Sequence, residues 1–368
     1  MRKILITNFH PRGGGGHVTY IQSLLALQDG GDVRIAVATP ESSRLYRYLK
    51  ESGYPDLYAC NFPGKLQKEL PSIIRSIRRF RAIVADFKPD LVHVNGGPDL
   101  FIALWSHPLG KYRIVRTHHA INSLSKDLYH RYAYSRRVSH NVYVSSSSME
   151  ISHAGGLIPK SSISIANGVD LDRFRPDFPR DEDLAARLSL PKNTFVFGSC
   201  AGVDPYKRVD IIIEAAVRLK SQRPFLILTI GDEKDGLQLE EQARASGVLQ
   251  FKHCGFHKDV RGFISLLDVG FVLSDSIETI SFAAREMFAM GKPLISSSYS
   301  GLKENVVDGH NGIIVRPGNV DDVASAMTRF LEMSSEERAR LSANARSYSE
   351  KNFGVKQQLQ RHLVVYQR

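Results

Sequence analysis

The stretch SDSIETISFAAREMFAMGKP, residues 274–293, places Glu278 and Glu286 in the chain with seven residues between them. The apolar run VGFVLS before it is typical of a buried strand, and TISFAAREMFAM has the composition and periodicity of a helix that ends at Gly291. One carboxylate is therefore expected on a strand-to-helix loop and the other inside the helix. In a doubly wound sheet such a loop faces a ligand crevice, and the helix N-terminus attracts an anion. A helix with two solvent-facing glutamates is the alternative.

The alternation of apolar runs and helical patterns continues on both sides of this stretch. One series is KILITNF, VRIAVAT, LVHVN, YRIVRTHH, HNVYVSS and SISIAN, and the other is TFVFGSC, FLILTIG, LQFKHCG, VGFVLS, PLISSS and GIIVRP. This pattern predicts two doubly wound α/β domains, each a parallel sheet covered on both faces, with a ligand cleft between them. We expect a first domain over 1–170, a Pro- and Asp-rich linker over 171–192 and a second domain over 193–350. A helix over 351–368 closes the second domain or packs back on the first.

Length and composition indicate a globular protein. The chain has 368 residues, of which 42% are hydrophobic, and it shows neither an apolar leader nor a run long enough to span a bilayer. Its three scattered cysteines, Cys60, Cys200 and Cys254, form neither a disulfide framework nor a metal-binding spacing. These features predict a cytoplasmic location.

The net excess of positive charge belongs entirely to the first half of the chain. Residues 1–180 hold 25 Lys and Arg against 14 Asp and Glu, whereas the remaining residues hold 24 of each. A one-sided basic domain suits nucleic acid, an acidic substrate or an anionic membrane surface. Composition does not choose among these, but no recognisable nucleic-acid-binding module is present, so we expect no nucleic-acid partner.

A glycine-rich turn follows the first strand, in NFHPRGGGGHVTYIQSLL. Residues 13–16 lack side chains, and Gly15 and Gly16 directly precede an expected helix that begins near His17. Their amides could approach a ligand closely. The dinucleotide spacing G-x-G-x-x-G is not met, and no acidic residue ends the second strand, VRIAVAT. A tight turn without a ligand is the other interpretation.

Together, these motifs resemble those of the family 4 glycosyltransferases. The resemblance covers the whole chain and rests on the glycine turn, SIANGVDLDRFRP (164–176), DPYKRVDIIIEAA, LTIGD, the pair of glutamates and GLKENVVDGHNGIIVRPGN. It implies the GT-B architecture, in which two Rossmann-like domains flank a cleft. It also implies sugar transfer from a nucleotide donor with retention of anomeric configuration, through a short-lived ion pair and without a covalent nucleophile.

The resemblance assigns roles to charged residues of the second domain. It implies that Lys207 neutralises the donor diphosphate, in place of a metal ion, so we expect no metal. Glu286 is similar to the family glutamate that accepts hydrogen bonds from ribose, and Glu278 to the one beside the transferred sugar. The family usually has an arginine where this chain has Gly202, and Arg208 is the candidate for the second positive charge.

Further donor contacts are implied for loop and glycine residues. They are Gly15, Gly16, Gly231 of LTIGD, Thr279, Ile280, Ser281 and Phe282. The family commonly has Phe and Gly where this chain has Ile280 and Ser281, and a side chain at Ser281 is expected to narrow the sugar pocket. In RIVRTHHAIN the family pattern selects His119 rather than His118 as a catalytic group that contacts the sugar or assists the acceptor. A core or capping role is the alternative for either histidine.

The stretch LQKELPSIIRSIRRFRAIVADF, residues 66–87, predicts an amphipathic helix with a basic face. Its apolar residues at three-to-four spacing are Leu66, Leu70, Ile73, Ile74, Ile77, Phe80, Ile83 and Phe87, and its cations are Lys68, Arg75, Arg78 and Arg79. A core-packed helix with a solvated basic face is the ordinary interpretation. The alternative is that this face meets anionic lipid or an acidic, lipid-linked glycan.

We therefore expect a retaining, metal-independent glycosyltransferase that moves a hexose-type sugar from a UDP- or GDP-linked donor. The expected acceptor is a glycan, a lipid-linked compound or another hydroxyl in envelope or surface polysaccharide or glycolipid synthesis, at the inner face of the membrane. No cofactor is expected, because the nucleotide sugar is a substrate. The alternatives are a nucleotide-sugar binding protein with weakened catalysis and a nucleotide-sugar epimerase of the same architecture.

Overall fold

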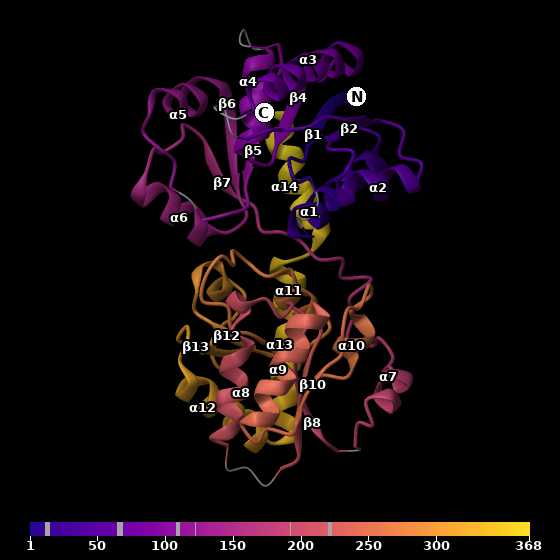
Figure 1. The fold of residues 1–368 in the computed structure, drawn as a ribbon, viewed down its shortest axis with the longest axis vertical. Coiled ribbons are helices and arrows are strands. Elements are labelled where there is room, and N and C mark those ends of the chain that lie inside the picture. The colour runs from indigo at the N-terminus through magenta and orange to yellow at the C-terminus, as the bar shows by residue number, and fades with distance from the viewer. Residues whose placement is uncertain (12–14, 65–68, 108–110, 122, 192, 220–222) are drawn as a thin grey trace. The chain divides into compact units, whose positions relative to one another are not determined.

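The computed structural model describes residues 1–368 except 12–14, 65–68, 108–110, 122, 192 and 220–222 (Figure 1). The chain forms two compact units, described separately below. Unit 1 contains residues Met1–Ala166 and Gln357–Arg368, and unit 2 contains Asn167–Lys356. The stretch expected as a linker, 171–192, lies inside unit 2.

In the described part of unit 1, seven parallel strands form one sheet in the order β3-β2-β1-β4-β5-β6-β7. The strands are β1 (Arg2–Thr7), β2 (Val33–Thr39), β3 (Leu57–Ala59), β4 (Leu91–Val94), β5 (Arg113–His118), β6 (Val138–Tyr143) and β7 (Ser162–Ser164). All were expected from the apolar runs except the three-residue β3, which is too short to show a pattern. Residues 4–7 of β1 and all of β4 are buried, because helices cover both faces of these central strands.

The connections of unit 1 are mostly helical. They are α1 (Gly15–Leu25), η1 (Ala26–Gly30), α2 (Arg44–Glu51), α3 (Leu70–Phe87), α4 (Gly97–Ser106), α5 (Leu128–Tyr132), η2 (Ala133–Arg137) and α6 (Ser146–Gly155). The expected C-terminal helical tail is two helices, α13 (Ser335–Asn352) in unit 2 and α14 (Val355–Gln367), most of which belongs to unit 1. None of the helices in the described ranges is long and apolar enough to cross a membrane.

In the described part of unit 2, six parallel strands form a sheet in the order β10-β9-β8-β11-β12-β13. The strands are β8 (Phe195–Ser199), β9 (Phe225–Thr229), β10 (Phe251–His253), β11 (Val269–Val272), β12 (Leu294–Ser297) and β13 (Gly312–Val315). The other elements are α7 (Glu182–Arg187), η3 (Pro205–Lys207), α8 (Val209–Val217), α9 (Glu233–Ala245), α10 (Arg261–Ser265), α11 (Phe282–Ala289), η4 (Ser300–Glu304) and α12 (Val320–Glu332).

Both faces of the second sheet are buried. Phe195 and Phe197 belong to one hydrophobic cluster, whereas Val196, the residue between them, belongs to another on the opposite face. Helices therefore cover the sheet on both sides, as Figure 1 shows for unit 2. This is the doubly wound arrangement expected from the sequence.

The strand orders define where a ligand site should lie in each unit. The order reverses between β1 and β4 in unit 1 and between β8 and β11 in unit 2. The loops after such strands diverge at the carboxyl edge of the sheet and leave a crevice there. The residues that follow these four strands are therefore the first candidates for a functional site.

Candidate functional site

Lys207 and Glu278 meet at the switch point of unit 2. Lys207 ends η3, which follows β8, and Glu278 lies on the loop between β11 and α11. The Lys207 ammonium forms an ion pair with Glu278 Oε2, and both side chains are largely buried. Ser274 Oγ donates a second, 3.3 Å hydrogen bond to the same carboxylate oxygen. The two residues are 71 positions apart in sequence and are brought together because β8 and β11 are neighbouring strands.

Arg208, the next residue, is held by two carboxylates. Its guanidinium contacts Asp210 Oδ2 at 2.9 Å and also forms an ion pair with Asp275. The hydrogen bonds to Asp210 and then to Asp275 raise the pKa of Arg208 above its ordinary value. Its backbone has φ +53°, in the left-handed region. Arg208 is therefore a charged group near Lys207 whose charge is balanced within its own loops.

The loop between β11 and α11 contains two residues in the left-handed region. Ile277 has φ +63° and Ser281 has φ +56°, although neither is a glycine. Such backbone is costly for a β-branched residue, and it is found where surrounding structure enforces a functional loop. The Ser281 hydroxyl caps α11 by accepting a 3.3 Å hydrogen bond from the Ala284 amide. Its side chain is buried and used in this cap.

Glu286 lies inside α11, as the sequence predicts, while Glu278 lies on the preceding loop. Its side chain is partly exposed, and it forms neither a hydrogen bond nor an ion pair with the part of the chain that the structure describes. Burial raises the pKa of Glu286 to about 7, against the attraction of the Arg173 charge. A carboxylate in this state has acceptor oxygens available for a ligand.

Two polar residues that the sequence analysis missed hold this loop in place. Arg285 is fully buried: its Nε donates to Asn305 Oδ1 at 3.0 Å, and its guanidinium lies 4.3 Å from the centre of the Phe353 ring. Burial lowers the pKa of Arg285 to about 10. Asn305 Nδ2 in turn donates to the Ile280 carbonyl at 2.6 Å. The signal was an arginine between the two glutamates and an asparagine in GLKENVVDG, but the pairing is visible only in three dimensions.

Glycines shape the loops beside Lys207. Gly231 has φ +155°, and a Cβ there would lie 3.1 Å from the Gly202 Cα and from Val203. Gly231 therefore permits the close approach of two loops. Gly202 itself has φ +89°, so the position that carries an arginine in the resembling family has a backbone here that disfavours any side chain.

His119 follows β5 in unit 1. Its Nε2 lies 2.9 Å from Asn95 Oδ1, on the loop after β4. Because Asn95 Nδ2 donates to the Thr7 carbonyl at 2.8 Å, Oδ1 must be the acceptor, and His119 Nε2 carries the proton. Burial, followed by the neighbouring charge that His17 would carry, holds the pKa of His119 well below its usual value. His119 is therefore a neutral imidazole with an acceptor nitrogen at Nδ1.

His118 and His119 occupy different environments. His118 is buried, stacks on the Tyr143 ring at 4.4 Å between ring centres and lies 2.9 Å from Asn141 Oδ1. His119 is partly exposed, and its ring centre lies 3.9 Å from that of His17 on α1. His118 is thus a core residue, and His119 lies among the loops at the carboxyl edge.

The glycine turn opens α1. Gly15 and Gly16 form its first turn, and a Cβ at Gly15 would meet no atom within 4 Å. Residues 13 and 14 of this motif lie outside the described residues. In the described ranges, no three His, Cys, Asp or Glu side chains group as metal ligands.

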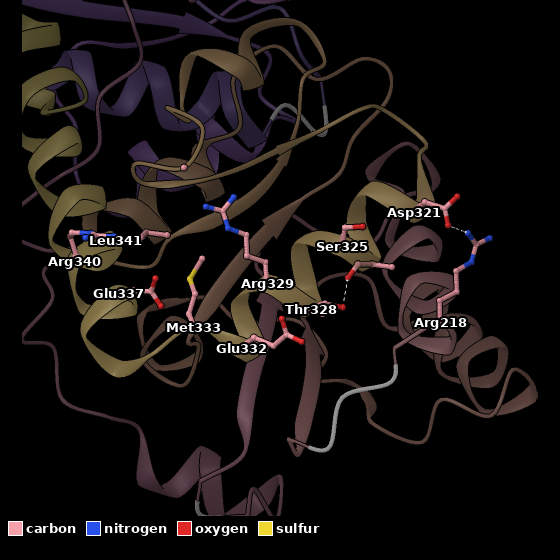
Figure 2. A pocket seen from close by; sticks show the side chains of 12 residues that line it. Arg218, Asp321, Ser325, Thr328, Arg329, Glu332, Met333, Glu337, Arg340 and Leu341 are labelled. Carbon is pink, nitrogen blue, oxygen red and sulfur yellow. Dashed lines mark hydrogen bonds and ion pairs between the residues drawn. The ribbon is translucent and has the colours of Figure 1, made fainter.

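A cavity of about 620 Å³ lies elsewhere in unit 2, between α12 and α13 (Figure 2). Figure 2 shows the ion pair of Arg218 and Asp321 at one end, and Arg329 and Glu332 projecting from the same helix. The lining alternates positive and negative groups and includes no residue of the loops that carry Lys207 and Glu278. The charged switch point is therefore the stronger candidate site.

Two protein families match consecutive parts of this chain. The family described as "Glycosyltransferase Family 4" matches residues 14–173, and the family described as "Glycosyl transferases group 1" matches residues 180–348. Similar curated proteins are named D-inositol 3-phosphate glycosyltransferase. The one from Stackebrandtia nassauensis is 29% identical over 194 residues, which are 48% of this chain and 42% of that protein. The one from Mycobacterium tuberculosis is 28% identical over 208 residues, 55% of this chain and 42% of that protein.

Solved structures of similar fold cover both units. A glycosyltransferase from Rickettsia africae has a TM-score of 0.88 at 17% identity, with 99% of this chain and 97% of that one covered. The Anabaena protein HepE in complex with UDP and glucose has a TM-score of 0.81 at 20% identity, with both chains fully covered. Sucrose-phosphate synthase from Thermosynechococcus elongatus has a TM-score of 0.81 at 16% identity, with 100% and 98% covered. At these identities, the likeness establishes a shared fold.

Proposed function

The chain belongs to the family 4 glycosyltransferases, which have the GT-B fold of two Rossmann-like units, and we propose that it is a retaining, metal-independent transferase. It moves a hexose-type sugar from a nucleotide-sugar donor to a hydroxyl group of an acceptor. The observation that carries this proposal is the meeting of Lys207 and Glu278 at the switch point of unit 2. The nucleotide sugar is a substrate, so the reaction uses no separate cofactor.

Lys207 and Glu278 match the two halves of such a donor. Cleavage of the bond between the sugar and the diphosphate leaves negative charge on the phosphate, which the Lys207 ammonium stabilises. Glu278 accepts hydrogen bonds from sugar hydroxyls and favours the positive charge that develops on the ring. These two side chains form an ion pair with each other. Donor binding therefore exchanges one ion pair for two ligand contacts.

The remaining donor contacts follow from the same loops. Glu286 accepts hydrogen bonds from the ribose hydroxyls, and the backbone amides of Thr279 to Phe282, which lead into α11, face the phosphates. Gly231 is a further proposed donor contact through its backbone, and its missing side chain leaves room for the neighbouring loop at Gly202 and Val203. Arg208 supplies a second positive charge if a phosphate displaces Asp275. Gly15 and Gly16 offer further amides from unit 1.

His119 contacts the transferred sugar in this proposal. Its neutral Nδ1 accepts a hydrogen bond from a sugar hydroxyl, and Asn95 fixes the ring orientation through Nε2. HepE was solved with UDP and glucose, so UDP-glucose is the first donor to test and GDP-linked sugars are the second. The acceptor is a glycan or a lipid-linked compound in envelope or surface polysaccharide or glycolipid synthesis.

Contact with an anionic membrane surface is part of the proposal. Unit 1 holds 24 Lys and Arg against 11 Asp and Glu, whereas unit 2 holds 25 against 27. Arg75 and Arg78 are exposed on α3. Sedimentation with vesicles at low salt tests this contact: recovery is expected to be greater on anionic than on neutral vesicles. Equal recovery on both would contradict it.

Donor binding is tested by the thermal shift of the pure protein with UDP, GDP, ADP and their sugar conjugates. One nucleotide series should raise the melting temperature, and Lys207→Gln should weaken binding of the matching diphosphate at least about tenfold, because a charge-assisted contact is lost. The matched control is Lys351→Gln, an exposed lysine on α13. Absence of any nucleotide effect would overturn the proposal.

A nucleotide-sugar binding protein with weakened catalysis is the second candidate. Gly202 with its positive φ, and an Arg208 that is already paired to two aspartates, favour it. Binding of the nucleotide sugar without transfer or hydrolysis would identify this function. An epimerase of the same architecture would convert the donor sugar without any acceptor, which product analysis distinguishes.

A further inference from the structure

Unit 1 contains an apolar pocket that no donor contact uses. Its volume is about 300 Å³, and its side-chain lining comes from Pro63, Ile73, Pro98, Phe101 and Tyr129. It lies where the first turns of α3 and α4 approach each other, and Figure 1 shows these two helices side by side. This volume is at the small end of the range for ligand sites, about 300–1,000 Å³.

The pocket is at the same edge of the sheet as His119. Gly97 also lines it, and this residue begins α4 only two positions after Asn95, whose side chain contacts His119. The loop that orients the proposed sugar-contacting histidine therefore continues directly into the pocket wall. A molecule whose hydroxyl reacts near His119 can extend a second part into this space.

Exposed apolar side chains continue from the pocket over the surface. Leu70 and Ile74, which the sequence assigned to the apolar face of α3, are 54% and 43% exposed instead of packing in the core. Trp105 is 54% exposed, and its ring centre lies 6.0 Å from that of Phe101, which lines the pocket. Burial of such groups against hydrocarbon would be favourable.

Helix α3 also carries the exposed cations Arg75 and Arg78. Arg78 follows Ile74 by four positions, so their side chains are neighbours on the surface of α3. Neither Arg75 nor Arg78 forms an ion pair or hydrogen bond with a described residue, and unit 1 carries a large excess of positive charge. The surroundings of the pocket thus combine apolar area with uncompensated positive charge, which is complementary to an anionic lipid.

We propose that this pocket binds the hydrocarbon chain of an anionic, lipid-linked acceptor. The inference rests on the proposed function and specifies its acceptor as one with an apolar chain next to a phosphate or carboxylate. The chain enters between α3 and α4, the anionic group lies over Arg75 and Arg78, and the reacting hydroxyl extends toward His119.

The test is direct binding of octyl phosphate, butyl phosphate and octanol, measured by calorimetry below the micelle concentration. Octyl phosphate should bind at least about tenfold more tightly than butyl phosphate, because four more methylenes leave water. Octanol should bind several-fold more weakly than octyl phosphate. The double variant Arg75→Gln, Arg78→Gln should remove this preference for the anion.

The decisive variant fills the pocket with a larger side chain. A Cβ at Gly97 would meet no atom within 4 Å, so Gly97→Leu fills the pocket without a backbone clash. It should reduce the advantage of octyl over butyl phosphate to less than about threefold. The matched control is Gly30→Leu, at another glycine of unit 1 with open space around its Cβ and no role in the pocket. Gly97→Met serves the same purpose if the leucine variant does not fold.

Three outcomes would overturn the inference: equal binding of the two alkyl phosphates, an unchanged chain-length preference in Gly97→Leu, or octanol binding as tightly as octyl phosphate. The UDP-induced thermal shift, measured on the same samples, separates this inference from the proposed function. A retained UDP shift with no alkyl preference rejects the pocket alone. Alkyl binding without any nucleotide effect would overturn its role as an acceptor site.

Discussion

The candidate site residues Lys207, Arg208 and Glu278, on the loops that follow β8 and β11 in unit 2, are charged. By contrast, Asn95 and His119, on the loops that follow β4 and β5 in unit 1, are neutral. In unit 2, Lys207 pairs with Glu278 and Arg208 with two aspartates. In unit 1, His119 is an uncharged imidazole bonded to an asparagine amide. Ion pairs can exchange a protein partner for a charged ligand, whereas a neutral hydrogen-bonded network mainly fixes orientation. One type of sheet topology therefore supports two kinds of chemistry.

Neutral groups near His119 in unit 1 also form a buried chain of hydrogen bonds. His362 Nδ1 lies 2.9 Å from the Gln358 carbonyl and must donate to it, so its Nε2 accepts from the Tyr20 hydroxyl at 2.7 Å. The chain then runs through Thr117 to His93. His93 Nδ1 in turn accepts from the Tyr366 hydroxyl at 2.6 Å. A single backbone carbonyl thus sets the direction of every link.

The largest expected effect concerns Glu278, on the charged loops of unit 2. Glu278→Gln should lower kcat for sugar transfer by about 10²–10³-fold, because an amide cannot balance positive charge on the ring. Assays with the donor identified by thermal shift would measure it. Glu241→Gln, at an exposed glutamate of α9, is the control and should keep full activity. Equal rates for both variants would remove Glu278 from the mechanism.

The second largest effect is expected at low pH, which should destabilise the buried hydrogen-bond chain that contains His362. Burial lowers the pKa of His362 to about 4, against an ordinary value of 6.5. The unfolded chain therefore binds a proton between these pH values while the folded protein does not, so stability is full above about pH 6.5 and falls as the pH decreases toward 4. The contribution of this histidine reaches about 3 kcal/mol. Denaturant unfolding from pH 8 to 4 measures the loss, and His362→Gln should show a shallower slope. An unchanged slope would show that His362 is not responsible.

The pairs Asn95–His119 and Asn141–His118 allow the orientation of a proposed catalytic histidine to be tested separately from the stability of the protein. Asn95→Ala frees the His119 ring and should lower kcat/KM about tenfold, with an altered pH profile because the His119 environment changes. Asn141→Ala removes the corresponding contact to His118 in the core. It should reduce stability but leave kcat/KM per folded molecule unchanged. If both variants lose activity equally, His119 has no special role.

The Glu286 carboxylate, which has no side-chain partner among the described residues, should respond to pH. The pKa of Glu286 is raised to about 7, so its ionised form, which has two acceptor oxygens for ribose hydroxyls, predominates at pH 8 and is minor at pH 6. Donor affinity should therefore fall by up to about tenfold from pH 8 to pH 6. Titration calorimetry at both values checks this, with Glu286→Gln as a variant whose weaker binding no longer depends on pH. A flat profile in the parent protein would reject the role.

The smallest effect concerns strain in the charged loop. Ile277 is 72% exposed and has φ +63°, which asparagine tolerates better than a β-branched residue. Ile277→Asn should raise the free energy of unfolding by about 1 kcal/mol. Thermal unfolding at constant pH measures it. A loss of stability would show that the isoleucine side chain makes a contact worth more than the strain.

Much of the fold was predictable because periodicity reports burial. Both parallel sheets, the positions of the two glutamates around the start of α11 and the helix expected over 66–87 follow from local patterns. This helix is α3 from Leu70 to Phe87, and Leu66 and Lys68 of the prediction lie outside the described residues. The ion pair of Lys207 and Glu278 was not visible as such, since it depends on the neighbouring placement of β8 and β11.

Other features depend on tertiary contacts that a linear pattern does not contain. The burial of Arg285 depends on its hydrogen bond to Asn305 and its contact with the Phe353 ring. Asn95 is important because its side chain is hydrogen-bonded to His119. The apolar stripe of α3 was read as a core face, but Leu70 and Ile74 are 54% and 43% exposed.

The return of α14 to unit 1 makes unit 2 an insertion within it. During synthesis, Tyr20 and His93 leave the ribosome long before His362 and Tyr366. The hydrogen bonds between these residues can therefore form only after all of unit 2 has been synthesised. If the segment from residue 357 onward were removed, buried hydroxyl and imidazole groups of the first unit would lose their hydrogen-bond partners. Loss of the C-terminal segment would therefore destabilise the sheet that the N-terminal residues form.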